Sequence, residues 1–213
     1  MHKFTPEVEE LANEILLYSL DRLKSDPPLD GPRTAADLFA EVGNTITERG
    51  LGGRAALGVF TEVLAKACIS TDHPRYLAYI PSAPRYFIPA LKKAAKRASQ
   101  KTIYFDSESD RDYAYMLINS SAMYWWWRVR DGGMTLSLET ITSLPLLDFE
   151  VDPEIVAALE KSEKTNKVYK QNAGAAQENV KHPKDLMNRV NKSVIPDYAD
   201  LLITLHENSE LSK

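Results

Sequence analysis

The sequence is poor in the residues that define several large classes of protein. It has a single cysteine, Cys68, among 213 residues, which excludes a disulfide framework and a cysteine metal cluster. A chain with so little cysteine fits a reducing compartment, and we expect a cytoplasmic location. No run of 18 apolar residues is present, so we expect neither a transmembrane helix nor a membrane partner.

Histidine is also scarce, and its distribution argues against a metal site. The four histidines, at positions 2, 73, 182 and 206, are spread along the chain with no pair at helical i, i+4 spacing. Zinc sites usually draw their ligands from short, regular spacings. The sequence therefore predicts no metal site, and it contains no recognisable complete set of catalytic side chains.

Tryptophan is rare too, yet its three copies are consecutive. Trp125, Trp126 and Trp127 are followed closely by Arg128 and Arg130. Neighbouring residues of a helix point about 100° apart, so three in a row spread around much of the cylinder. Two interpretations stay open. The rings fill a small core, or some of them face a nucleic acid while the arginines contact phosphates or guanine edges.

Charge is distributed unevenly along the chain. Residues 1–84 carry 8 basic and 12 acidic side chains, whereas residues 85–213 carry 18 of each. Within the second part, residues 85–101 hold six basic side chains and no acidic one. The six are Arg85, Lys92, Lys93, Lys96, Arg97 and Lys101. Such a block often marks a partner of negative charge.

We expect part of this block to be a helix over about 89–99, which would gather four of its cations on one broad face. Two explanations of that face remain. It binds a polyanion, or its charges pair within the chain with the acids just downstream. Those acids are Asp106, Glu108 and Asp110.

The hydrophobic periodicity predicts a mostly helical α+β fold made of two small units. Residues 1–84 read as an N-terminal helical unit, and residues 85–213 as a mixed unit with short strands. In the second unit, KTIYF (101–105) is typical of a strand. A helix capped by the SESD residues is expected over about 110–128, with Asn119, Ser120 and Ser121 inside it.

Two further helical segments are expected towards the end of the chain. Asp152 and Pro153 have the residue types that begin a helix. The polar stretch 160–184 is predicted to be a long exposed helix or a partly mobile segment. A last helix is expected around Tyr198 to Leu205.

The loop ISTDHPRYLAYIPSAP, residues 69–84, carries the first of two family resemblances. With the helices before it, this loop resembles the N-terminal region of group II pyridoxal-phosphate-dependent decarboxylases, the aromatic amino acid decarboxylase group. The resemblance implies a substrate-lining role for Tyr79, Pro81 and Ser82. The cofactor-binding domain and the lysine of that family are absent, so this part is expected to be inactive.

The motif INSSAMYWWWRVRDGGMTLSLETITSLPL, residues 118–146, carries the second resemblance. Residues 85–205 are similar to the C-terminal target-recognition region of adenine-N6 DNA methyltransferases of the restriction–modification type. The resemblance implies that full-length relatives use S-adenosylmethionine and that this region binds double-stranded DNA. The family's catalytic loop and its S-adenosylmethionine pocket lie upstream of this region and are not in the chain.

Our leading hypothesis is a DNA-recognition fragment that is not catalytic on its own. The six cations of the basic block would contact phosphates, and Arg128 and Arg130 would contact a groove. A methyltransferase catalytic core or a second copy of the chain would be further partners. The alternatives are a truncated pyridoxal-phosphate decarboxylase and a helical interaction protein.

The two resemblances meet between Pro84 and Arg85. A natural fusion, an engineered chimera and a misassembled chimera all remain open as explanations of that junction.

Overall fold

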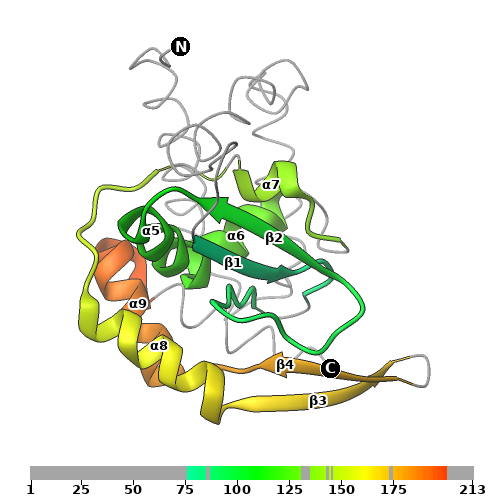
Figure 1. The fold of residues 1–213 in the computed structure, drawn as a ribbon. Coiled ribbons are helices and arrows are strands. Elements are labelled where there is room, and N and C mark those ends of the chain that lie inside the picture. The colour runs from blue at the N-terminus through cyan, green and yellow to red at the C-terminus, as the bar shows by residue number, and fades with distance from the viewer. Residues whose placement is uncertain are drawn as a thin grey trace, which may run out of the picture.

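The computed structural model describes residues 76–84, 87–130, 135–142, 144, 146–172 and 175–200. In these ranges helices and two small antiparallel sheets alternate along the chain (Figure 1). The α+β class expected from the sequence is therefore confirmed at this coarse level. The predicted N-terminal helices of residues 1–75 lie outside the described residues.

The first sheet pairs β1 (Tyr76–Pro81) with β2 (Gln100–Phe105) in antiparallel register, from Tyr76 opposite Phe105 to Pro81 opposite Gln100. Alternate residues of a strand point to opposite faces. Ala78 and Ile103 face each other and are buried, whereas Tyr104 between two buried neighbours is 41% exposed. The predicted strand at KTIYF is confirmed, and its partner strand lies before the expected boundary at Pro84.

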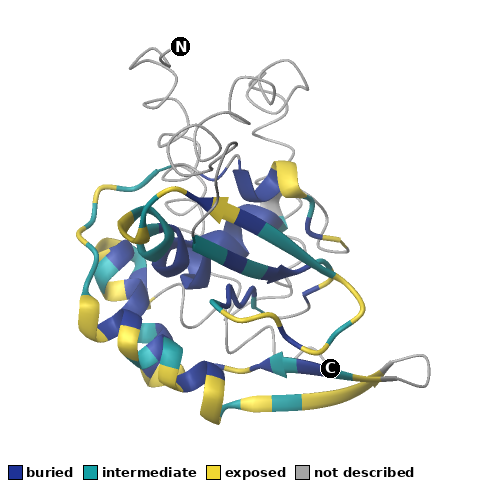
Figure 2. Ribbon diagram, in the orientation of Figure 1, coloured by how far each residue is buried: buried dark blue, intermediate teal, exposed yellow. Residues whose placement is uncertain are grey.

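Two consecutive helices follow, α5 (Glu108–Asn119) and α6 (Ser121–Arg130). Helix α5 packs against this sheet, and both helices contribute buried residues to the core (Figure 2). Ser107 caps α5 by accepting a hydrogen bond from the Asp110 backbone N–H at 3.0 Å, as the sequence indicated. The prediction of one helix through residues 119–121 is wrong, because the chain turns extended at Ser120.

The break between α5 and α6 is held by a residue far away in the sequence. Asn191 accepts a hydrogen bond from the Ser121 backbone N–H at 2.8 Å and donates one to Ser121 Oγ at 3.0 Å. Ser120 Oγ donates to the carbonyl of Leu117 at 2.7 Å. Serine and asparagine side chains can replace the backbone hydrogen bonds of a helix in this way, and here they interrupt the helix between α5 and α6.

All three tryptophans of α6 are completely buried. Their neighbours Ala122 and Met123 are also at 0% exposure, so the part of the helix from Ser121 to Trp127 is enclosed on every side. A fan of rings needs no external partner when the helix that carries it runs through the middle of the core. Of the two interpretations of the tryptophans, the structure shows the core one.

The basic helix predicted over 89–99 is wrong. This segment is irregular, and much of its backbone bonds to distant strands and side chains instead of forming a helical ladder. Leu91 exchanges both backbone hydrogen bonds with Tyr79 of β1, at 2.7 and 2.8 Å. Ala90 is clamped by Asn119, whose amide accepts from its N–H at 3.1 Å and donates to its carbonyl at 3.0 Å.

After α6 the chain forms a short helix α7 (Leu138–Thr142), and then α8 (Pro153–Thr165) follows. The side chain of Asp152 caps α8 by accepting from the N–H groups of Glu154 and Ile155, so the predicted start at Asp152 and Pro153 is confirmed. The connector between the two helices is tied to α5, because Tyr113 Oη donates to the Leu147 carbonyl at 2.7 Å.

The long helix predicted over 160–184 is wrong beyond Thr165. An antiparallel hairpin of β3 (Lys167–Asn172) and β4 (Ala175–Val180) follows α8 directly. Valine and tyrosine in KVYKQN favour a strand, and Asn166 ends the helix. In Figure 1 the hairpin extends away from the rest of the described part.

The last described elements are α9 (Lys184–Val194) and the 3₁₀ turn η1 (Pro196–Tyr198). Helix α9 packs Val190 and Val194 into the core beside α5 and α8. The final helix was expected to continue to Leu205, and residues 201–213 lie outside the described part. No helix within the described ranges is long and apolar enough to cross a membrane.

Candidate nucleic-acid interface

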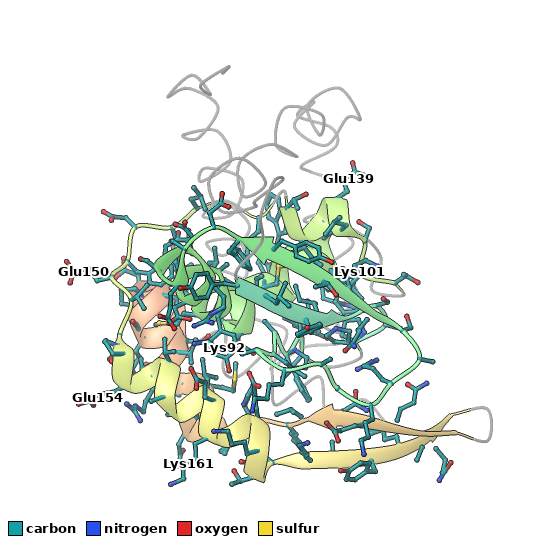
Figure 3. All side chains as sticks on the ribbon, viewed as in Figure 1. Lys92, Lys101, Glu139, Glu150, Glu154 and Lys161 are labelled. Carbon is teal, nitrogen blue, oxygen red and sulfur yellow. The ribbon has the colours of Figure 1, made fainter. Side chains whose placement is uncertain are left out.

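The residues predicted to bind DNA are best judged by what each side chain contacts. Lys92, in the middle of the basic block, points into the protein (Figure 3). Its ammonium nitrogen lies 2.6 Å from Asp112 Oδ1 on α5 and 2.6 Å from Glu160 Oε1 on α8. Only 11% of its side chain is exposed, so Lys92 joins two helices and is not placed to contact a phosphate.

Lys92 belongs to a mostly buried polar network that fixes the start of the basic segment. Its backbone N–H donates to Glu163 Oε1 at 2.9 Å, and the phenol of Tyr115 donates to the same oxygen at 2.5 Å. Burial, reinforced by the Glu163 carboxylate, raises the pKa of Tyr115. Burial also raises the pKa of Glu163, against the opposing effect of the two hydrogen bonds that it accepts.

Lys93 and Lys96 are exposed, as the DNA-binding hypothesis requires. Lys96 is held by its backbone, because its carbonyl accepts the N–H of Glu178 on β4 at 2.8 Å. Lys101, on β2, is half-buried, and its ammonium lies 3.5 Å from Ser82 Oγ. Among the described cations of the block, the Lys92 side chain is mostly buried, Lys93 and Lys96 are exposed, and Arg97 and Lys101 are half-buried.

Arg97 connects the basic segment to the hairpin. Its Nη1 donates to Asn179 Oδ1 on β4 at 2.7 Å, and its Nε donates to the Ser99 carbonyl at 3.0 Å. Burial lowers the pKa of the guanidinium, which stays charged at neutral pH. A small apolar cluster of Leu91, Ala95 and Val180 joins the same two segments.

The hairpin and the end of α8 carry functional candidates that the sequence analysis missed. Residues 161–184 contain six lysines and two glutamates. Both glutamates are buried, Glu163 at 7% and Glu178 at 5% exposure, while the lysines of α8 and β3 are exposed. The sequence does contain a signal for this site, namely the strand pattern of KVYKQN next to lysines spaced three residues apart. It was overlooked because the stretch 160–184 was assigned to a helix or a mobile segment.

We use the name lysine-rich surface for the exposed lysines of the basic loop, the end of α8 and both faces of β3, which are Lys93, Lys96, Lys161, Lys164, Lys167 and Lys170. It spans the basic loop, the end of α8 and strand β3, which are joined by the Lys92, Lys96 and Arg97 contacts above. In Figure 3, Lys161 points outward near the hairpin. The exposed acids Glu139, Glu150 and Glu154 lie away from it.

Glu178 is the one carboxylate beneath the hairpin, and two neighbours satisfy it. Lys167 Nζ lies 3.1 Å from Oε1, and the phenol of Tyr169 donates to Oε2 at 3.2 Å. The Tyr169 ring itself is 63% exposed, the highest value among the large hydrophobic side chains of the described residues. The exposed ring of Tyr169 therefore lies next to Glu178, the only acidic residue of the β3–β4 hairpin.

His182 lies just after the hairpin, where β4 leads into α9. It is 4% exposed, and its Nδ1 is 2.9 Å from Ser162 Oγ on α8. Burial lowers the pKa of the imidazole to about 4. The ring is therefore neutral at pH 7 and adds nothing to the positive charge of the surface.

The remaining predicted residues are less accessible or not described. Arg85 and the side chain of Arg130 lie outside the described residues, and Arg128 is half-buried near the end of α6. Of the substrate-lining candidates, Pro81 is buried and Tyr79 packs against the Leu91 cluster. The Ser82 carbonyl accepts the N–H of Leu136 at 2.9 Å.

Within the described part of the chain no group of three or more histidine, cysteine, aspartate or glutamate side chains could hold a metal ion. No protein family, curated protein or solved structure matches this chain.

Proposed function

We propose that this chain is a DNA-recognition fragment of an adenine-N6 DNA methyltransferase of the restriction–modification type. It binds duplex DNA and transfers no methyl group on its own. One observation carries the proposal: two basic segments far apart in the sequence meet in the lysine-rich surface, while Glu163 and Glu178 beside them are buried and Glu160 is paired with Lys92. A ligand approaching this surface therefore meets net positive charge.

The spread of the lysines favours a polyanion over a single small anion. The exposed ammonium groups lie on a loop, on the end of a helix and along a strand. Duplex DNA carries about one negative charge per 1.7 Å of its axis, so it offers a row of phosphates to such a surface. Contacts to phosphates supply affinity and orientation without reading sequence.

The chemistry of methyl transfer would belong to a separate catalytic core. The second family resemblance puts the S-adenosylmethionine pocket upstream of the matching region, so the methyl donor is assigned to that partner. The present chain would hold the DNA, and we expect no product from S-adenosylmethionine and DNA without the partner.

The test is the salt dependence of duplex binding, measured by anisotropy of a dye-labelled duplex. We expect Lys93→Ala/Lys96→Ala to weaken binding to every sequence alike and to reduce the slope of log affinity against log salt by about 2, near 0.9 per lost contact. The matched control is Arg189→Ala/Lys192→Ala, which removes two exposed cations from α9.

If the α9 variant loses as much slope as the loop variant, binding is diffuse and the lysine-rich surface is not the DNA site. If the unaltered chain binds no duplex at low salt, the proposed function is wrong.

A further inference from the structure

We infer that the β3–β4 hairpin is the sequence-reading element of this chain, a two-stranded ribbon that enters the major groove of the bound duplex. The inference rests on the proposed function and names the part of the protein that distinguishes one DNA sequence from another. The major groove of B-form DNA is about 12 Å wide and admits a two-stranded β-ribbon.

The hairpin has the shape that such a role needs. Its strands have six residues each and pair fully, from Lys167 opposite Val180 to Asn172 opposite Ala175. Within the described residues, the end next to the body is anchored through Val180 in an apolar cluster, the Glu178 N–H on Lys96 and the Asn179 side chain on Arg97. Further out, Gln171 and Ala176 are exposed, so the outer part of the ribbon is accessible.

The side chains of the hairpin suit a groove better than a protein core. Lys167, Tyr169, Lys170 and Gln171 are consecutive or alternate positions of β3, and all are exposed. Gln177 is half-exposed on β4 and opposite Lys170. Glutamine amides make paired hydrogen bonds to adenine N6 and N7, and lysine donates to guanine O6 and N7.

The two glutamines cover both faces of the ribbon. Gln171 pairs with Ala176, and Gln177 pairs with Lys170, so their side chains leave the strands on opposite faces. Whichever face meets the base edges, one amide is available to it. Removing both leaves the net charge unchanged and therefore separates base reading from phosphate attraction.

The lysines have another explanation that the experiment must exclude. Charged side chains on an edge strand also prevent association of that edge with other chains. In that case the hairpin would be a protected edge, and the loop lysines alone would hold the DNA. The two explanations differ in whether the hairpin affects which sequences are bound.

The experiment selects duplexes bound by the full chain from a random-sequence pool and sequences them. We expect the unaltered protein to enrich a short motif that contains adenine. The Gln171→Ala/Gln177→Ala variant should keep its salt slope but lose discrimination at one or more motif positions, by about 5- to 150-fold per lost paired contact. The Lys93→Ala/Lys96→Ala variant should enrich the same motif as the unaltered protein with lower affinity.

The outcomes separate the two proposals. If the glutamine variant enriches the same motif as strongly as the unaltered protein, the hairpin does not read the sequence and this inference is overturned. Binding by the unaltered protein without any enriched motif overturns it as well, and both results leave duplex binding intact. A chain that binds no duplex removes the proposed function and the inference together. Equal melting temperatures of the proteins exclude misfolding as a cause.

Discussion

Single buried polar side chains link segments of this protein that are far apart in the sequence. Asn191 is fully buried and uses both ends of its amide to hold Ser121 at the break between α5 and α6. Asn119 does the same for Ala90 at the start of the basic loop. Buried polar groups without such partners are costly, so each amide specifies one arrangement of the segments that it joins.

His182 gives a testable pH dependence at this scale. Its pKa is about 4 in the folded protein against an ordinary value of 6.5, because burial disfavours the charged ring. Between these values the unfolded chain takes up a proton that the folded chain does not. Stability should therefore fall as pH falls from about 6.5 to about 4, by about 3 kcal/mol at about 1.4 kcal/mol per pKa unit.

The measurement is the free energy of unfolding in denaturant at pH 7, 5.5 and 4, for the unaltered chain and for His182→Gln. The difference between them should shrink or reverse towards low pH. The pKa of Glu163 is raised, so its protonation in the folded state adds stability as pH falls, which is the opposite effect. Both proteins contain Glu163, so the difference between their stabilities reports on His182. Parallel pH curves for the chain and the His182 variant would contradict the assignment.

At the scale of elements, α6 departs from the usual amphipathic helix. A surface helix buries one stripe and exposes the other, whereas α6 has Trp125, Trp126 and Trp127 all at 0% exposure. Tyr124 adds an edge-to-face contact with Trp127, with ring centroids 5.9 Å apart. Most of the large side chains of the core therefore belong to this helix and its neighbours.

We predict that the three substitutions Trp125→Ala, Trp126→Ala and Trp127→Ala are all strongly destabilising. Each should cost about 3–5 kcal/mol, since each removes a large buried side chain and leaves a cavity. Leu138→Ala on α7, where the side chain is 47% exposed, should stay within about 0.5 kcal/mol. Chemical denaturation of the four variants checks this, and one near-neutral tryptophan variant would show that its face of α6 is exposed.

The elements also show which parts of this fold are readable from sequence. The SESD residues, which include the cap Ser107, and Asp152 were correctly identified as capping residues, because a cap acts on residues two or three positions away. The break at Ser120 was missed because the residue that holds it, Asn191, lies 70 positions further along. A helix over 89–99 was predicted wrongly for a similar reason, since Leu91 bonds to Tyr79, which lies 12 positions earlier.

The candidate site shows the same division between local and distant information. The sequence identified the basic block, but only the folded chain turns Lys92 inward to Asp112 and Glu160. The lysines of β3 were not identified because the length of a polar segment favoured a helix. Burial of Glu163 and Glu178, which leaves the surface positive, depends on tertiary packing and has no signal in composition.

At the scale of the whole molecule, the expected boundary at Pro84 crosses the first sheet. β1 lies before it and β2 after it, and the two strands pair along their full length. Ala78 and Ile80 of β1 are at 0% exposure within the same core as α5 and α6. Strand β1 therefore shares one core with α5 and α6, which lie after the expected boundary.

We predict that the fragment 75–213 unfolds cooperatively on heating and that the fragment 85–213 does not. The shorter fragment lacks β1, which exposes the edge of β2 and the apolar residues that β1 covers. Circular dichroism of both fragments during thermal unfolding makes the comparison. Equal midpoints and equal cooperativity would show that β1 is dispensable to the core.

The burial of α6 has a spectroscopic consequence. All three indoles of the chain lie in consecutive positions of one enclosed helix, so its ultraviolet emission reports on a single place in the protein. In the native state that emission should be blue-shifted and resistant to iodide quenching. A duplex bound along the hairpin would leave it unchanged, whereas opening of the core would shift it to the red. The protein thus carries a built-in probe that separates ligand binding from unfolding.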